Sequence, residues 1–401
     1  MRRRRRRILF VSEAVTLAQV VRLAVLARGL PREDFEVHFA AAHFDEMIFA
    51  GADLRRWPIA SLPAALVDRR VRRGLRIYGR RTLQRYLAED LRVIDAVRPD
   101  LVVGDLRLSL AVAAPLRAVP HAALINAYWS PFATRSGFPL PDHPIVRLLG
   151  PRLAAHYFPR ALPRVFAHFA APVNWLRRRH GLSEIGSLPE TLCYGDLTLH
   201  PDPEALVPTA GAPPEHQHLG PISWAPALAR PASWSRLAAA RPTVYVTLGS
   251  SGRVELLPLV VAAVLELGAQ ALVATAGRVQ LPSAPGLHVA DYVPGDLAVA
   301  RADVVVCNGG STTAYQALAA GRPVVGLPAN LDQYLAMDAI IRAGAGVLVR
   351  AGNASKAGIR AAIEAALHDP SLQAAAARVS SWFGGADAPT RFERVIRALP
   401  L

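Results

Sequence analysis

The chain has 401 residues, of which 52% are hydrophobic and 19% are charged, and its formal net charge is +15. This composition excludes an intrinsically disordered chain, and the length allows two domains with separate cores. The positive charge is carried almost entirely by arginine, since Lys356 is the only lysine. No aromatic and basic motif accompanies the charge, so we expect a globular protein that does not bind nucleic acid.

The number of cysteines and the lengths of the apolar stretches indicate in which cell compartment the protein is expected. Cys193 and Cys307 form neither a disulfide framework nor a metal-ligand spacing, and no stretch reaches the ~18 uninterrupted apolar residues of a membrane-spanning helix. We expect a cytoplasmic protein. The arginine run Arg2–Arg7 is interpreted as a solvated tail, with a tether to anionic lipid on the inner membrane face as the alternative.

The first half opens with a strand, a helix and a strand, at Ile8–Glu13, Leu17–Arg28 and Phe35–Ala41. This order predicts a parallel sheet with right-handed crossovers. Further helices are expected at Thr82–Val97, Leu108–Leu116 and Arg152–His180, and further strands at Leu101–Asp105, His121–Ile125, Asp196–His200 and His216–Leu219.

Two segments of this half lack a clean period. Arg55–Arg85 is densely basic and is interpreted as exposed helix and loop, with contact to an acceptor or a membrane as the alternative. Asn126–Gly150 is rich in aromatic residues and proline, and a long loop inside a compact domain is more often functional than idle.

A second series of alternating strands and helices follows a linker at residues 221–242. We expect an α/β protein with two doubly wound, Rossmann-like parallel-sheet domains, at residues 1–220 and 243–383. The strands are expected at Thr243–Leu248, Ala271–Thr275, Leu287–Ala290, Val304–Cys307, Val324–Leu327 and Gly346–Val349, with helices at Val254–Leu267 and over Leu372–Leu399.

Two glycine turns in the second half, Gly249–Gly252 and Asn308–Thr313, each join the end of a strand to a helix. Such turns aim free N–H groups and the positive end of the helix dipole at one spot, which suits a phosphate. In the alternative interpretation the glycines only turn the chain and the hydroxyls only cap helices. The hydroxyl side chains in question are Ser250, Ser311, Thr312 and Thr313.

The longer pattern Asn308-Gly-Gly-Ser-Thr-Thr313, Gln316-Ala-Leu, Gly321-Arg-Pro323, Pro328 and Asp332-Gln333 resembles the donor-binding signature of the UDP-glycosyltransferase family. Asp291–Pro294 and Thr247–Ser250 are similar to its base-binding segment and first phosphate loop. The resemblance extends to bacterial natural-product, macrolide and lipid glycosyltransferases. It implies the GT-B fold, with the donor in the second domain, the acceptor in the first, and residues 384–401 crossing back to the first domain.

The resemblance also implies a role for each matching residue. Tyr292 would stack on the base, Val293 would meet it through its main chain, and Gln316 would contact the ribose. Asp332 and Gln333 would bond the sugar hydroxyls. The diphosphate would be held by Gly249, Ser250, Asn308, Gly309, Gly310, Ser311, Thr312 and Thr313.

Three departures from the signature concern the donor. Asn308 replaces a histidine and cannot carry positive charge, and Thr312 replaces a glycine. Gln316 replaces a glutamate and loses a charge-assisted hydrogen bond. We therefore expect lower donor affinity or an altered sugar preference.

A fourth departure concerns the general base. By the resemblance a histidine is expected in the turn after the first strand, where Gln19 stands, and glutamine cannot accept a proton at neutral pH. Asp105 matches the partner aspartate and could act alone if burial raises its pKa; alternatively it caps the next helix. Glu13 and His143 are weaker substitutes.

The resemblance implies an inverting displacement in which an acceptor oxygen attacks the anomeric carbon as the nucleoside diphosphate leaves. No Asp-x-Asp pair occurs, so we expect no metal and no cofactor beyond the donor, a nucleotide-diphosphate sugar with UDP as the expected nucleotide. His216 and His218 lack a third ligand and are not expected to bind metal. Side chains expected to contact a small apolar or lipid acceptor are Asn126, Tyr128, Trp129, Phe132 and His143. Plain core or lid packing of the aromatic side chains is the alternative.

Two other functions remain open on the same scaffold. One is a non-catalytic protein that binds sugar nucleotides or a partner, motivated by Gln19, Asn308 and Gln316. The other is a nucleotide-sugar epimerase or hydrolase. The feature that distinguishes a transferase from these alternatives is a working general base.

Overall fold

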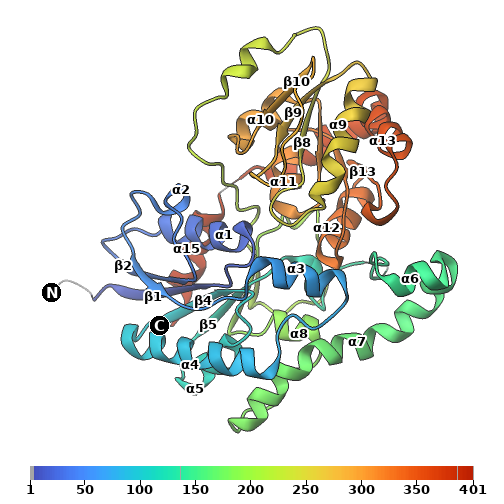
Figure 1. Ribbon diagram of the computed structural model, residues 1–401. Helices are drawn as coiled ribbons and strands as arrows, with labels where there is room; N and C mark the ends of the chain where they lie inside the picture. Colours follow the sequence, from blue (N-terminus) through green and yellow to red (C-terminus); the bar gives the residue numbers. More distant parts are fainter. Residues whose placement is uncertain (1–3, 136, 386, 401) are drawn as a thin grey trace. The chain divides into compact units, whose positions relative to one another are not determined.

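The computed structural model describes residues 4–135, 137–385 and 387–400, without the side chains of residues 144, 145, 147 and 151. The chain forms two compact units. The first comprises residues 1–137, 151–222 and 386–401, and the second comprises residues 138–150 and 223–385 (Figure 1).

The first unit is built on a seven-stranded parallel sheet in the order β3-β2-β1-β4-β5-β6-β7. Its central strands are almost continuously apolar, as expected for strands covered on both faces. Ser12 at the end of β1 lies opposite Asp105 at the end of β4. The strands are β1 (Arg6–Ser12), β2 (Phe35–Ala41), β3 (Arg55–Pro58), β4 (Leu101–Asp105), β5 (His121–Leu124), β6 (Leu197–His200) and β7 (His216–His218).

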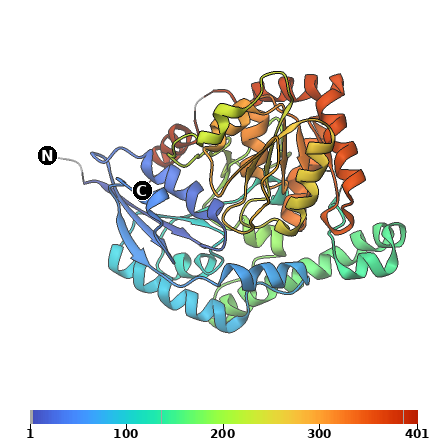
Figure 2. The ribbon, with the colours of Figure 1, turned by 45° about the horizontal axis from the view of Figure 1, so that its top comes forward.

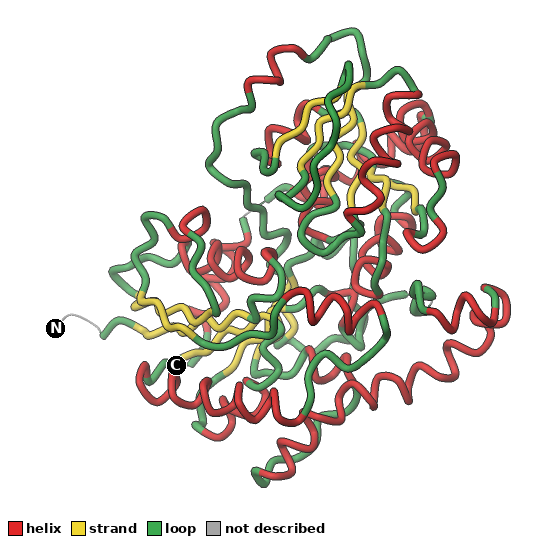
Figure 3. The backbone as a smooth tube through the Cα atoms, viewed as in Figure 1, coloured by secondary structure: helices red, strands yellow, loops and turns green. Residues whose placement is uncertain are grey.

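Helices cover both faces of this sheet (Figures 1 and 3). Helix α1 (Leu17–Arg28) packs with α15 (Ala388–Ala398), while α4 (Arg80–Val97) packs with α5 (Leu110–Leu116) and α7 (Pro151–Arg179). The apolar face of α4 joins Val102 and Leu9 in one core. The shorter helices are α2 (Glu46–Phe49), α3 (Ala64–Arg72), α8 (Leu188–Leu192) and the 3₁₀ turn η1 (Ala127–Trp129).

The second unit holds a six-stranded parallel sheet in the order β10-β9-β8-β11-β12-β13. Strands β8 and β11 are neighbours near its centre, where the strand order reverses, and open α/β sheets bind ligands at such a point. The strands are β8 (Thr243–Thr247), β9 (Gln270–Ala274), β10 (Leu287–Ala290), β11 (Val304–Cys307), β12 (Val324–Gly326) and β13 (Gly346–Leu348).

Helices of the second unit pack in two groups. Helix α9 (Leu257–Glu266) contacts α13 (Lys356–His368), and α11 (Ser311–Ala319) contacts α10 (Gly295–Arg301) and α14 (Pro370–Ser380). The remaining elements are α6 (Pro144–Leu149), α12 (Leu331–Arg342), η2 (Ala232–Arg236), η3 (Val254–Leu256), η4 (Ala351–Asn353) and η5 (Ser381–Phe383).

The predicted α/β class with two parallel sheets is confirmed. Three local predictions were wrong. Arg6 and Arg7 are not a tail but the first residues of β1, where the Arg7 N–H donates to Asp100 at 2.7 Å. The basic segment contains the edge strand β3, which pairs with β2, and the expected loop at 126–150 contains η1 and α6. Among the described residues, no helix is long and apolar enough to cross a membrane.

Candidate functional site

Two turns and the start of one helix in the second unit meet at the hydroxyl of Ser251. The Nδ2 group of Asn308, after β11, donates to Ser251 Oγ at 3.2 Å. The Nε2 group of Gln333, on α12, donates to the same oxygen at 3.4 Å. These bonds join the turns that follow β8 and β11 to the start of α12, so the two glycine turns predicted to face one ligand do lie together. We call this arrangement the Ser251 junction.

The two amides of the junction are fixed at both ends. Asn308 Oδ1 accepts a hydrogen bond from the Gly310 N–H at 3.0 Å, and Gln333 Oε1 accepts one from the Ala329 N–H at 2.8 Å. Both side chains are buried. Gln333 thus bonds protein groups, whereas the neighbouring Asp332 is exposed in the first turn of α12.

Glycine is required at two points of these turns. Gly309 has φ +76°, and a Cβ atom there would lie 2.6 Å from Met337 Cγ. A Cβ at Gly252 would lie 2.2 Å from the Leu248 carbonyl oxygen. The missing side chains let the two turns pack against Met337 and Leu248. Helix α11 begins directly afterwards at Ser311, and the first N–H groups of a helix have no intrahelical acceptor.

Arg278 is a neighbour of this site that the sequence analysis missed. Its Nη1 group donates to the carbonyl oxygens of Gly249, at 3.1 Å, and Gly252, at 3.0 Å, and the side chain is exposed. It therefore places a positive charge beside the first glycine turn, close to Asn308, where the resemblance implied a histidine. Its position in the turn after β9 could have indicated this role, because β9 is the strand next to β8.

The residues expected at the base and ribose have different environments. Tyr292 is 45% exposed, so its ring is open to a stacking partner, and Val293 is buried. Gln316 Nε2 donates to the Trp224 carbonyl oxygen at 2.6 Å. That bond ties α11 to the segment that precedes β8.

In the first unit, Gln19 closes the turn between β1 and α1. Its Oε1 atom accepts hydrogen bonds from the N–H groups of Val15, at 3.2 Å, and Thr16, at 3.0 Å. This is the reciprocal half of a capping box, which satisfies helix N-terminal donors. Gln19 is thus held in a structural role at the position where the resemblance implied a histidine.

Asp105 is paired with an arginine rather than an imidazole. Arg22 donates from Nη2 and Nε to the two carboxylate oxygens, each at 2.9 Å, and from Nη1 to Asn126 Oδ1 at 2.7 Å. Asn126 Nδ2 continues the network to Asp202 at 2.8 Å. All four side chains are buried. The sequence analysis missed Arg22, although a charged residue in the otherwise apolar stripe of α1 was a signal.

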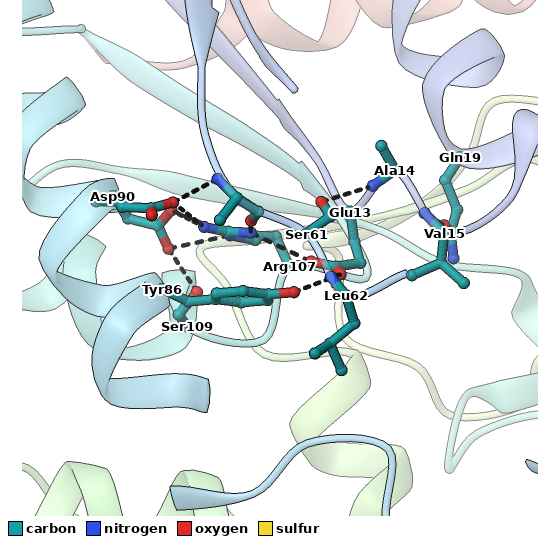
Figure 4. Close-up of polar contacts among 12 residues, drawn as sticks. Glu13, Ala14, Val15, Gln19, Ser61, Leu62, Tyr86, Asp90, Arg107 and Ser109 are labelled. Atoms are coloured by element: carbon teal, nitrogen blue, oxygen red, sulfur yellow. Dashed lines mark hydrogen bonds and ion pairs between the residues drawn. The ribbon is translucent and has the colours of Figure 1, made fainter. Parts of the chain in front are cut away.

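Glu13 belongs to a separate buried network (Figure 4). Tyr86 Oη donates to its Oε1 at 2.9 Å and Arg107 Nη1 to its Oε2 at 3.2 Å, while Arg107 also binds Asp90. Two buried carboxyl groups share one guanidinium, so one of them keeps its proton more readily than usual. Burial raises the pKa of Glu13 to about 7, against the pull of Arg107, and burial raises the pKa of Asp90 as well.

Most residues expected to contact the acceptor pack against their own unit. Tyr128 is buried, the Trp129 ring lies 6.5 Å from that of Phe166, and Phe132 packs edge-on against another ring. His143 lies in the segment 138–150, which belongs to the second unit.

Comparisons with known proteins identify the family. A model of the C-terminal domain of erythromycin biosynthesis protein CIII-like proteins matches residues 259–398. The chain is 45% identical over 398 residues to a PGL/p-HBAD biosynthesis glycosyltransferase of Mycobacterium tuberculosis, covering 98% of this chain and 93% of the relative. It is 46% identical over 401 residues to a PGL/p-HBAD biosynthesis rhamnosyltransferase of Mycobacterium bovis, covering 99% and 89%. The chain belongs to the UDP-glycosyltransferase family.

This glycosyltransferase also resembles solved structures. The spinosyn rhamnosyltransferase SpnG complexed with thymidine diphosphate has a TM-score of 0.67 at 21% identity, covering 98% of this chain and 100% of that chain. Its complex with spinosyn aglycone gives a TM-score of 0.66 at 22% identity, covering 97% and 99%. The predicted GT-B fold is therefore confirmed, and the mycobacterial relatives confirm the predicted enzyme class.

Proposed function

We propose that this glycosyltransferase catalyses an inverting, metal-independent transfer from a nucleoside-diphosphate sugar to a hydroxyl group of a small apolar or lipid acceptor. The observation that carries the proposal is the Ser251 junction, which gathers two glycine turns and the start of α11 at one place. Such a place offers backbone N–H groups to an anion without needing a metal ion.

Stabilisation of the leaving diphosphate is the main catalytic contribution in this proposal. As the bond to the sugar breaks, negative charge grows on the diphosphate, and fixed donors aimed at it lower the barrier. The N-terminus of α11 supplies the dipole and Arg278 supplies a full positive charge beside Gly249. Arg278 thus compensates for the charge that Asn308 does not carry.

The donor is proposed to be a UDP- or dTDP-linked hexose or deoxyhexose. The family signature favoured UDP, while the similar solved enzyme is complexed with thymidine diphosphate and the Mycobacterium bovis relative is named a rhamnosyltransferase. Exposed Tyr292 can stack on either pyrimidine.

The first unit offers no strong base at the predicted positions to take the proton of the acceptor hydroxyl. Gln19 cannot take it, and both carboxylate oxygens of Asp105 already accept hydrogen bonds from Arg22, so Asp105 is a poor proton acceptor. We therefore propose an acceptor whose hydroxyl ionises more readily than that of an alcohol, as a phenol does at a pKa of ~10. Asp105 remains the proposed base for that milder task.

A second candidate is a protein that binds the sugar nucleotide without transferring the sugar. It is favoured by the neutral side chains of Gln19, Asn308 and Gln316, at positions where the family signature has His, His and Glu. The two candidates agree on nucleotide binding and differ on turnover.

The test is mass spectrometry of acceptor mixtures incubated with the enzyme and a panel of UDP- and dTDP-sugars, with matched phenols and aliphatic alcohols among the acceptors. We expect a glycosylated phenol and free nucleoside diphosphate in equal amounts, with little product from the alcohols. Nucleotide binding without any product would favour the second candidate, and equal transfer to alcohols would contradict the proposed acceptor class.

A further inference from the structure

Helix α7 is unusually basic and lacks acidic residues. Between Asp142 and Glu184 the sequence contains seven arginines and neither aspartate nor glutamate. Helix α7 occupies 29 of these residues, all within the first unit. A stretch of this length with one sign of charge creates a local positive potential.

The two halves of α7 differ in burial. From Leu162 onward the helix buries an apolar stripe that includes Phe166 and Val173 and packs on α4 and α5. From residue 152 to 161 only Ala154 is buried among the described side chains. Figures 1 and 2 show this first half extending beyond α4 and α5 of its own unit.

The exposed face of the first half carries large apolar groups. Leu153 is 55% exposed and Tyr157 is 56% exposed. Arg160 and Arg164 follow at spacings of three and four, so the four side chains form one stripe along the helix. We call Leu153, Tyr157, Arg160 and Arg164 the α7 stripe.

The arginines of the stripe have no carboxylate partner in the described part of the chain. Arg160 donates to the His156 carbonyl oxygen at 2.8 Å and contacts the His156 ring, both within α7. Arg164 is exposed. Their charge is therefore available to an external anionic surface.

We propose that the α7 stripe docks this enzyme on an anionic lipid bilayer. The helix lies in the plane of the interface, with Leu153 and Tyr157 inserted at the boundary of headgroups and acyl chains and the guanidinium groups on lipid phosphates. The apolar groups make a bilayer the better occupant than a soluble polyanion, because a polyanion offers no apolar phase. This inference does not depend on the identity of the donor or the acceptor.

The experiment measures co-sedimentation of the full chain with phosphatidylcholine vesicles, with and without phosphatidylglycerol. We expect binding only with phosphatidylglycerol and weakening as salt is added. Leu153→Gln/Tyr157→Gln and Arg160→Gln/Arg164→Gln should each weaken binding by about tenfold. The control Arg301→Gln/Arg394→Gln changes two exposed arginines elsewhere, keeps the same net charge as the second variant, and should bind like the unmodified chain.

A fluorescent label distinguishes insertion from charge attraction alone. Cys193 and Cys307 are buried, so Ala161→Cys, on the exposed side of α7, can be labelled selectively with a polarity-sensitive dye. A blue shift on adding anionic vesicles supports insertion. The proposal is overturned if anionic vesicles do not bind, if the control loses binding like the stripe variants, if Leu153→Gln/Tyr157→Gln binds normally, or if the label shows no shift. Circular dichroism spectra and urea unfolding curves that match those of the unmodified chain verify that every variant is folded.

Discussion

Arg22 holds both carboxylate oxygens of Asp105, with two hydrogen bonds of 2.9 Å between buried side chains. The partner of this carboxylate is thus a guanidinium, whereas the family resemblance implied an imidazole. The pair orients Asn126 as well, through Arg22 Nη1. This relationship determines what the first unit can contribute to proton transfer.

Removing one member of this pair should be more damaging than removing both. Arg22→Met leaves a buried carboxylate without its cation and should lower the free energy of unfolding by about 3–5 kcal/mol. The double variant Arg22→Met/Asp105→Asn, which removes both charges, should be less destabilised than Arg22→Met. Urea unfolding measures both. A double variant as unstable as the sum of the two single changes would show that the ion pair is not coupled.

Asp105→Asn should abolish sugar transfer and leave nucleotide affinity nearly unchanged. The carboxylate belongs to the first unit, whereas the proposed nucleotide site belongs to the second. Initial rates with a phenolic acceptor and calorimetric titration with UDP or dTDP separate the two effects, and unfolding curves verify that the variant is folded. Undiminished turnover would eliminate Asp105 as the base.

The contribution of Glu13 to the free energy of unfolding should decrease as the pH rises from 4.5 to about 7. Over this range the folded protein keeps the Glu13 proton and the unfolded chain loses it, so raising the pH favours unfolding. The shift from 4.5 to about 7 corresponds to roughly 3 kcal/mol at most.

Glu13→Gln cannot titrate and should lose this part of the slope, as measured by urea unfolding at a series of pH values. Exposed Glu204→Gln serves as the control and should keep the slope of the unmodified protein. Parallel curves for Glu13→Gln and the unmodified protein would show that Glu13 is not the group responsible.

Gly309→Ala should destabilise the second unit and remove nucleotide binding. The matched control is Gly268→Ala, because Gly268 has φ +72° against +76° for Gly309 but has no atom within 4 Å of its missing Cβ. Gly268→Ala should cost about 1 kcal/mol for the backbone alone. Gly309→Ala should cost about 1–3 kcal/mol more, because its methyl group meets Met337. Thermal unfolding compares them, and equal losses would contradict the close contact.

The sequence predicted the architecture because long apolar strands and strongly periodic helices carry their own pattern. Leu101–Asp105 and Leu17–Arg28 were predicted with the bounds that the structure has. The edge strand β3, with sequence RRWP, has three polar or proline positions and forms only because β2 offers it a partner. Tertiary pairing of that kind leaves no local signal.

The donor site was predicted in outline because its glycine turn and the residues of the family signature lie close together in the sequence, between Asn308 and Gln333. Ser251 and Arg278 were missed because their roles come from contacts with residues 57 and 29 positions away. Likewise, the buried Glu13 accepts hydrogen bonds from Tyr86 and Arg107, which are 73 and 94 positions away in the sequence. Whether a polar side chain is free to bind a ligand or is bonded within the protein depends on partners that are distant in the sequence.

The central claim is that the diphosphate of the donor lies at the Ser251 junction, beside Asn308. Calorimetric titration of UDP and dTDP into Asn308→Asp and Asn308→His tests it most directly, since the two side chains differ in the charge they can carry. We predict that Asn308→Asp weakens binding by at least about tenfold, because a carboxylate would face the phosphates, and that Asn308→His binds as tightly as the unmodified enzyme or more tightly. Equal affinity of Asn308→Asp and the unmodified enzyme for both nucleotides would contradict the claim.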